Sequence, residues 1–306
     1  MNTSAPSFDD YARWVAANLD GSRLVSAHAL AGGVSAEMRR LVLETPQGAQ
    51  EIVVRMQRDN EWKGGEASVS AKEFNLLRAL HRKGLKVPAI LHLDVTGAIL
   101  PAPCYAMELV PGSSTVRDEA LESALEQMAE FLRQLHELDG EDQDLPLLED
   151  PRTEVFQYLP DPDAARLVRE VVENSPGDAP ANPPRLLHGD FWPGNVLWHE
   201  DRLAAVVDWE DAALGDPLAD LAAARVELLC QYDERAMELF TRRYLSGSDL
   251  DVSDLPLWEI YVSASALATM EHWGLAPDEE AARRLDTQGF LHRAVADLAE
   301  AAKAGP

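Results

Sequence analysis

Three side chains in the second half of the chain have types and spacing that could do chemistry together: Asp190, Asn195 and Asp208. The first two lie in residues 188–195 (HGDFWPGN), and the third follows the apolar run 202–207. A loop carboxylate can accept the proton of an attacking hydroxyl group, while an amide oxygen and a second carboxylate can hold Mg²⁺ against nucleotide phosphates. The spacing therefore predicts phosphoryl transfer, with Asp190 as the catalytic base and Asn195 and Asp208 as Mg²⁺ ligands.

Short apolar runs flank these residues and predict the elements that must position them. Residues 185–187 lead into the loop, residues 196–198 leave it, and residues 202–207 form a run of strand length. The predicted order is strand, loop, strand, hairpin, strand. This order would bring Asp190, Asn195 and Asp208 together at one site. Gly189 and Gly194 permit tight backbone geometry inside the loop. An aspartate that merely caps a turn is the alternative for Asp190.

Composition limits the classes of partner. The chain has 306 residues, of which 46% are hydrophobic, and no apolar stretch reaches the roughly 18 residues of a membrane span. Its 53 acidic and 27 basic side chains give a net charge of −26, which argues against nucleic acid and anionic membranes. This charge is compatible with a cationic small molecule, or simply with a heavily solvated surface. Two cysteines and the absence of a signal-peptide pattern indicate a cytoplasmic protein. The sequence leaves both a monomer and a homodimer open.

Hydrophobic periodicity indicates an α+β protein. Strands are expected near the start, joined over a glycine-containing turn in residues 30–38, and no P-loop motif occurs. A crossing strand at 104–110 is followed mainly by helices. The expected strands are 40–44, 51–56 and 104–110, and the expected helices are 8–19, 71–82, 119–138, 163–173, 218–232, 234–245, 257–273 and 279–302.

Four short motifs resemble the aminoglycoside phosphotransferase family, which also includes choline-kinase-like enzymes. They are Leu187-His188-Gly189-Asp190, Pro193-Gly194-Asn195, Val207-Asp208-Trp209-Glu210, and residues 215–222 (GDPLADLA). The resemblance implies a bilobal protein-kinase-like fold, with a small antiparallel-sheet N-terminal lobe (1–110) that binds nucleotide and a larger, mostly helical C-terminal lobe (111–306) that carries catalysis and substrate binding. It also implies transfer of the γ-phosphate of ATP, or of GTP, to a hydroxyl group of a small molecule.

The resemblance also assigns nucleotide contacts. Arg55 stands where relatives usually carry a lysine on the α- and β-phosphates, and Glu73 is the carboxylate expected to orient it. Arginine can hold phosphate oxygens in a bidentate fork, so the exchange is chemically sound. Glu108, through its carbonyl, and Val110, through its amide, are expected to contact adenine. Relatives often have asparagine where this chain has Ala36, which leaves only backbone amides for that turn.

Further residues have supporting roles in this interpretation. His188 is expected to be a structural hydrogen-bonding residue, and Asp216 and Asp220 are expected to hold the catalytic loop through backbone hydrogen bonds. The acceptor would bind among the helices of the second lobe, where Glu271, His272 and Trp273 are candidate contacts. Aminoglycosides, macrolides, choline-like alcohols, sugars and amino-acid alcohols are all candidate acceptors.

Two other functions are compatible with the same residues. A metallohydrolase would use His188, Asp190, His199 and Asp208 to hold a transition metal, but the basic strand residue and the crossing strand would then have no role. A catalytically inactive nucleotide-binding scaffold would have lost the base or a metal ligand. All three are present in this sequence, and only the Arg55 exchange favours a scaffold.

Overall fold

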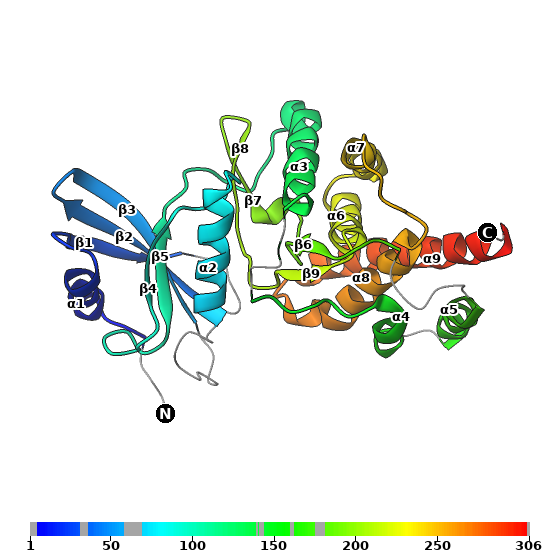
Figure 1. The fold of residues 1–306 in the computed structure, drawn as a ribbon, viewed down its shortest axis with the longest axis horizontal. Helices are drawn as coiled ribbons and strands as arrows, with labels where there is room; N and C mark the ends of the chain where they lie inside the picture. Colours follow the sequence, from blue (N-terminus) through cyan, green and yellow to red (C-terminus); the bar gives the residue numbers. More distant parts are fainter. Residues whose placement is uncertain are drawn as a thin grey trace. The chain divides into compact units, whose positions relative to one another are not determined.

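In the computed structural model of the chain, the described residues are 5–30, 36–57, 69–138, 140, 144–159, 162–174 and 181–304. The chain divides into an N-terminal unit, residues 1–112 with 204–210, and a C-terminal unit, residues 113–203 with 211–306 (Figure 1). The expected glycine-containing turn lies largely outside the described residues, because these exclude 31–35.

A five-stranded antiparallel sheet forms the centre of the N-terminal unit, with strand order β1-β2-β3-β5-β4. Ser7 and Asp10 form a capping box that begins helix α1, which precedes the sheet. Helix α2 connects β3 to β4. The elements are α1 (Phe8–Asn18), β1 (Arg23–Ala29), β2 (Ala36–Thr45), β3 (Gly48–Gln57), α2 (Val69–Arg82), β4 (Ile90–Asp94) and β5 (Cys104–Glu108).

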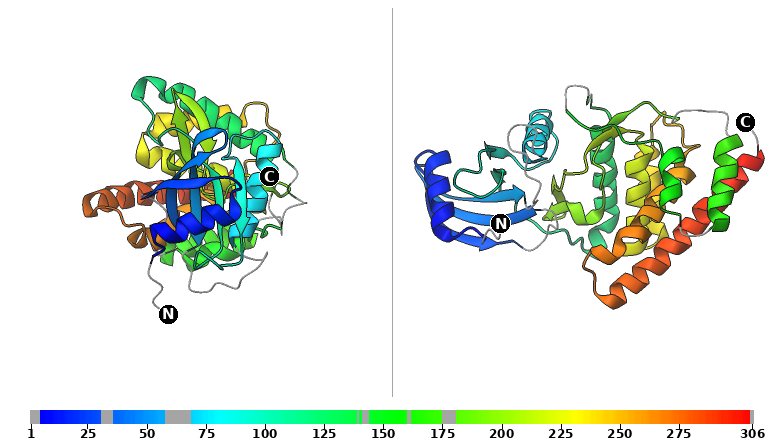
Figure 2. Two further views of the ribbon diagram at one scale, coloured as in Figure 1. Left: turned by 90° about the vertical axis from the view of Figure 1, so that its left-hand side faces the viewer. Right: turned by 90° about the horizontal axis from the view of Figure 1, so that it is seen from below.

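The two helices cover opposite faces of this sheet (Figures 1 and 2). Side chains alternate along a strand, so Ile52, Val54 and Met56 of β3 pack in the same core cluster as Trp14 of α1. Arg55 therefore faces the other way, toward α2, where it pairs with a buried glutamate. The alternation is thus what directs a charged side chain of β3 to the face that α2 covers.

The C-terminal unit is mostly helical, and its strands β6 and β9 form a short pair. Strands β7 and β8 form a second pair, and residues 204–206 of β8 belong to the N-terminal unit. The helices of the C-terminal unit include a long pair, α8 and α9, that packs along much of its length. The elements are η1 (Asp118–Ala120), α3 (Leu121–His136), α4 (Pro151–Glu154), η2 (Val155–Gln157), α5 (Pro162–Asn174), β6 (Arg185–Leu187), η3 (Pro193–Asn195), β7 (Val196–His199), β8 (Arg202–Val206), β9 (Ala213–Gly215), α6 (Leu218–Gln231), α7 (Glu234–Leu245), α8 (Leu255–Thr269), η4 (Met270–His272) and α9 (Pro277–Ala304).

The predicted combination of an antiparallel sheet and a helical half is confirmed. Leu125, Met128 and Leu132 of α3 are buried, as their helical spacing predicts. Two local expectations were wrong. Ala36 and Glu37 belong to strand β2 rather than to the preceding turn, and the helix expected to reach Trp273 ends at Thr269 and continues as η4. No described helix combines the length and the apolar character needed to cross a bilayer.

Candidate active site

In the N-terminal unit, Arg55 is the centre of a cluster of carboxylates. Its Nη1 lies 2.9 Å from Oε2 of Glu73, and its Nη2 lies 2.6 Å from Oε2 of Glu210 and 3.8 Å from Oδ1 of Asp208. Arg55 is only 5% exposed and Glu73 only 4%. Neither residue is therefore an exposed surface charge. The role of Arg55 in phosphate binding stays a prediction.

The electrostatics of this cluster follow from one buried cation among several acids. Burial raises the pKa of Glu73 to about 7, with Asp208 and Glu210 adding to the increase and Arg55 and a hydrogen bond with Tyr105 opposing it. Burial disfavours the charge of Arg55, but the surrounding acids outweigh that cost and raise the pKa of Arg55 above its ordinary value. The guanidinium is thus firmly positive and its nearest carboxylates compete for it.

Asp208 and Glu210 reach Arg55 from a segment that continues beyond β8. Trp209 between them is 2% exposed, and its Nε1 donates to the Val206 carbonyl oxygen at 3.0 Å. Asp208 has a φ of +66°, a left-handed conformation that costs a non-glycine residue free energy, although aspartate adopts it more readily than most residues. The contact between Glu210 and Arg55 was not predicted, although the spacing Asp-x-Glu was the available signal.

The crossing strand β5 ends at Glu108, two residues before the expected end at Val110. The amide of Glu108 donates to the carbonyl of Ala89 at 2.9 Å, and its Oε1 accepts from the amide of Ala89 at 3.0 Å. Val110 lies in the irregular segment after the strand and is half-buried. The side chain of Glu108 is thus occupied by its own unit, so its predicted contact with adenine would use the backbone.

Residues 188–195 of the C-terminal unit, which we call the catalytic loop after its predicted role, bring Asp190 and Asn195 together. Nδ2 of Asn195 donates to Oδ2 of Asp190 and to the Asp190 carbonyl, both at 2.9 Å. Among the described residues, the amide oxygen of Asn195 accepts no hydrogen bond, and this oxygen is the atom that a Mg²⁺ ligand would use. The amide of Asp190 donates to Nδ1 of His188 at 3.2 Å. His188, which is fully buried, therefore acts as a hydrogen-bonding residue of the loop.

Asp220 of α6 holds the start of this loop. Its carboxylate accepts from the amides of His188, at 2.8 Å, and Gly189, at 2.9 Å, and lies 3.1 Å from Nε2 of His136. Nδ1 of His136 lies 2.7 Å from the hydroxyl of Tyr244. Burial would raise the pKa of Asp220, but the bonds with His136 and His188 outweigh it and lower that pKa. Tyr244 of α7, His136 of α3 and Asp220 of α6 thus form a buried polar network that ends on the backbone of the catalytic loop.

Packing fixes the same loop from other directions. Gly189 has a φ of +85°, and a Cβ there would lie 2.0 Å from the carbonyl oxygen of Asp211, so another residue would displace the backbone. Phe191 stacks on Phe131 of α3, with ring centroids 6.0 Å apart and an interplanar angle of 3°. Its ring also lies 6.5 Å from the ring of Phe240 of α7 and 5.9 Å from that of His188. The loop is therefore anchored by both hydrogen bonds and aromatic packing.

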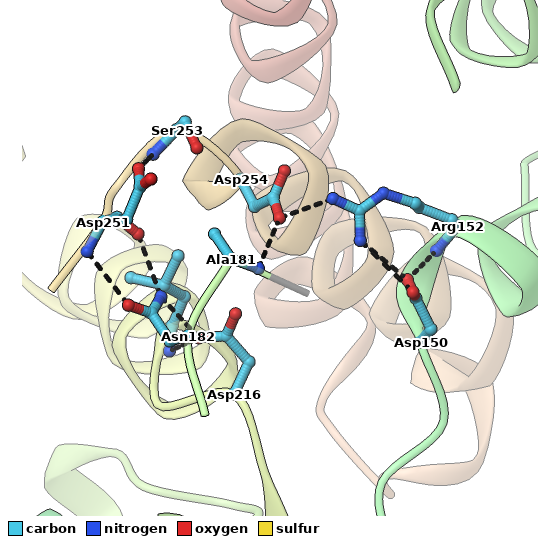
Figure 3. Close-up of polar contacts among 9 residues, drawn as sticks. Asp150, Arg152, Ala181, Asn182, Asp216, Asp251, Ser253 and Asp254 are labelled. Carbon is cyan, nitrogen blue, oxygen red and sulfur yellow. Dashed lines mark hydrogen bonds and ion pairs between the residues drawn. The ribbon is translucent and has the colours of Figure 1, made fainter. Parts of the chain in front are cut away.

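The segment before β6 is tied down by a polar network (Figure 3). Nδ2 of Asn182 donates to Oδ1 of Asp216 at 3.1 Å and to the carbonyl of Asp251 at 2.9 Å, and the amide of Asp251 donates back to Asn182. Asp216 also accepts the amide of Leu218 at 2.9 Å, at the start of α6. Asp216 thus fixes the segment before strand β6 rather than the loop of residues 188–195, which corrects its expected role.

The candidate acceptor residues behave differently from one another. Glu271 and His272 are exposed and pair only weakly with each other, at 3.5 Å. The ring of Trp273, in contrast, lies 5.6 Å from the guanidinium carbon of Arg283, which also faces the ring of Trp192. Arg283 was not singled out in the sequence, because nothing local distinguishes it from the other arginines of α9.

The arrangement gives no support to the metallohydrolase alternative. His188 is buried with Nδ1 engaged by the loop, whereas His199 is exposed at the end of β7. Within the described ranges, no three histidine, cysteine, aspartate or glutamate side chains form a group that could hold a metal.

Comparison with known structures supports the fold. A protein from Ralstonia eutropha JMP134 assigned as an aminoglycoside phosphotransferase aligns with a TM-score of 0.68 and 17% identity, over 97% of this chain and 98% of that one. The macrolide 2′-phosphotransferase of Brachybacterium faecium aligns with a TM-score of 0.60 and 21% identity, over 92% and 98%. Such neighbours confirm the predicted protein-kinase-like fold.

Curated relatives match shorter segments. Acyl-CoA dehydrogenase family member 11 of Gallus gallus is 32% identical over 175 residues, 50% of this chain and 22% of that protein. Viomycin phosphotransferase of Streptomyces vinaceus is 39% identical over 77 residues, 24% of this chain and 26% of that enzyme. The chain spans less than a third of the length of either relative. The model of the phosphotransferase enzyme family, however, matches residues 26–256. The chain therefore belongs to the phosphotransferase enzyme family.

Proposed function

We propose that this protein transfers the γ-phosphoryl group of ATP to a hydroxyl group of a small molecule in the cytoplasm. The observation that carries the proposal is the catalytic loop, in which Asn195 orients the carboxylate of Asp190 and Asp220 holds the backbone before it. A carboxylate fixed in this way can orient an acceptor hydroxyl and take up its proton as the new oxygen–phosphorus bond forms. Membership in a phosphotransferase family supports the same reaction.

The proposed nucleotide contacts divide between the two units. Arg55 would neutralise the α- and β-phosphates, Glu73 would keep its guanidinium in place, and the backbone at Glu108 and Val110 would face adenine. Asn195 and Asp208 supply the oxygen donors that suit Mg²⁺. Bound there, the ion would neutralise charge on the phosphates. That the two residues bind one ion remains a prediction.

The decisive experiment is an ADP-release screen across hydroxylated small molecules, with ATP and with GTP, and with Asp190→Ala as the blank. Acceptor-dependent ADP release that the blank lacks would support the proposal. An inactive scaffold would instead bind ATP–Mg²⁺ and release no ADP with any acceptor. A protein that binds neither nucleotide would contradict both functions.

Replacing Asp208 by alanine is expected to weaken Mg²⁺-dependent nucleotide binding at least ~10-fold, because a metal ligand is lost. Binding of ADP without Mg²⁺ should change little. Isothermal titration calorimetry with and without the ion measures both. Asp201→Ala is the matched control, since Asp201 is a nearby aspartate that pairs with Arg117 instead. Normal ATP–Mg²⁺ binding by Asp208→Ala would contradict the metal assignment.

Glu210 is expected to compete with nucleotide phosphates for Arg55. Its side chain is 28% exposed, so the ion pair is partly screened and contributes about 1 kcal/mol, which corresponds to roughly fivefold in affinity. Glu210→Gln should therefore tighten Mg²⁺-free ADP binding by about that factor. Glu51→Gln is the control, because Glu51 lies on the same strand β3 as Arg55 but pairs with Arg40. Equal affinities in the wild type and Glu210→Gln would show that Glu210 does not compete.

A further inference from the structure

Four side chains of the C-terminal unit form a cluster that we call the arginine cage: Trp192, Glu227 and Trp273 around Arg283. The guanidinium carbon of Arg283 lies 5.9 Å from the ring centroid of Trp192 and 5.6 Å from that of Trp273. Both terminal nitrogens of Arg283 bond to Oε2 of Glu227, Nη1 at 3.1 Å. The side chains of Arg283 and Glu227 are only 14% and 15% exposed.

The two tryptophans and the glutamate around Arg283 are of the residue types that bind organic cations in proteins. Indole faces attract a cation through the ring quadrupole, and a largely buried carboxylate adds charge-assisted hydrogen bonds. The residues come from separate parts of the chain: Trp192 from the catalytic loop, Glu227 from α6, and Trp273 from the turn that follows η4. Without the Arg283 side chain, the same groups would form a site for an amine or a guanidinium ion.

The cage borders the proposed reaction centre. Trp192 is two residues from Asp190, and its indole ring covers Gly194, where a Cβ would lie 2.1 Å from the nearest ring atom. Burial is the main cause of the raised pKa of Glu227, and the ion pair with Arg283 opposes it. The charge of Asp190 also raises this pKa, so Glu227 lies within electrostatic reach of Asp190. The cation site that Arg283 occupies therefore lies next to the place where an acceptor hydroxyl must bind.

We propose that Arg283 fills an organic-cation site beside Asp190 and thereby excludes the positively charged groups of acceptor molecules from it. The inference about acceptors rests on the proposed phosphotransferase function, whereas the cation site itself does not. A tethered guanidinium competes with free amines at an effective concentration that is typically in the millimolar range. Despite its net charge of −26, the protein would thus select acceptors that carry no positive charge at this position.

Direct binding of a small cation tests the site without any catalysis. Methylguanidine, followed by calorimetry and by quenching of tryptophan fluorescence, should bind Arg283→Ala at least ~10-fold more tightly than the wild type. Tetramethylammonium should show the same preference. The double variant Arg283→Ala, Glu227→Gln should lose this gain, because the carboxylate that holds the cation is gone.

Arg293→Ala is the matched control for the binding experiment. Arg293 lies on the same helix α9, pairs with Glu234 at 2.6 Å and faces the ring of Phe290 at 5.6 Å, so its removal also breaks a stacked ion pair. It should gain no methylguanidine binding. If Arg283→Ala fails to fold, Arg283→Gln, which can still donate a hydrogen bond to Glu227, takes its place.

The possible outcomes test the cation site and the phosphotransferase function separately. Equal, weak binding of methylguanidine by the wild type and the Arg283 variants would overturn the proposal, as would saturable binding to the wild type at the cage. Comparing ADP release with glucosamine, glucose and glucuronate gives the consequence for acceptors: the ratio of amine to neutral substrate should rise at least ~10-fold in Arg283→Ala. If no acceptor releases ADP, the phosphotransferase function fails while the binding result still decides the site.

Discussion

Replacing Asp190 by alanine is expected to lower turnover by at least ~10²-fold while leaving the affinity for ATP–Mg²⁺ within a few-fold of the wild type. The carboxylate of Asp190 is held by Asn195 at 2.9 Å, and its proposed contribution is to orient and deprotonate the acceptor hydroxyl. Removing it should therefore slow the chemical step and spare nucleotide binding. Steady-state ADP release and nucleotide titration measure the two quantities separately.

The conservative variant Asp190→Asn sharpens this experiment. An asparagine keeps the size of the side chain, and its amide oxygen can still accept the hydrogen bond from Asn195. It cannot, however, act as a base. Its turnover should therefore fall nearly as far as that of Asp190→Ala. If Asp190→Asn retained most of the wild-type rate, the side chain would serve the loop as a structural residue and not as a base.

Asp220→Ala is expected to have the largest effect on stability. It leaves two loop amides and the ring of His136 without the buried carboxylate that they share, and each buried donor left without a partner typically costs about 1–3 kcal/mol. Urea unfolding should report a loss of that order. Asp233→Ala is a suitable control, because Asp233 also accepts a backbone amide, that of Ala236, but only as the cap of α7. Equal losses in the two variants would contradict a special role for Asp220.

The same residue makes stability depend on pH in a defined direction. The pKa of Asp220 in the folded protein lies below its ordinary value of 3.8. The unfolded chain therefore binds a proton more readily, and the stability that Asp220 contributes is present above about pH 3.8 and is lost as the pH falls through the lower, folded pKa. In Asp220→Asn, this part of the acid sensitivity should be absent from a series of urea midpoints measured against pH.

Those parts of the molecule that depend on local pattern could be predicted from the sequence. The buried face of α3 follows from helical spacing, and the loop between β6 and β7 follows from the short apolar runs around it. The contact between Asn195 and Asp190 joins residues only five positions apart, so the motif itself implied it. Such features are set by geometry within a few residues.

Long-range partners could not be predicted in this way. Glu210 pairs with Arg55 across 155 positions, and Asn182 joins Asp251 across 69. Arg283 looks like any other charged residue of a helix whose neighbours are mostly polar, and only the folded chain brings Trp192 and Glu227 to it. Charged and amide side chains have many equivalent partners in a sequence, and the folded backbone decides among them.

Phe191 is the immediate neighbour of the proposed base, and it is also fully buried between aromatic rings of α3 and α7. Core residues that pack against Phe191 are therefore expected to affect the turnover that depends on the proposed base. Phe131 and Phe240 do not belong to the loop. A substitution at either position would nevertheless change the packing of Phe191 and, through it, the orientation of the Asp190 side chain. Under the proposed function, evolutionary change in this part of the interior would be constrained by the reaction as well as by folding.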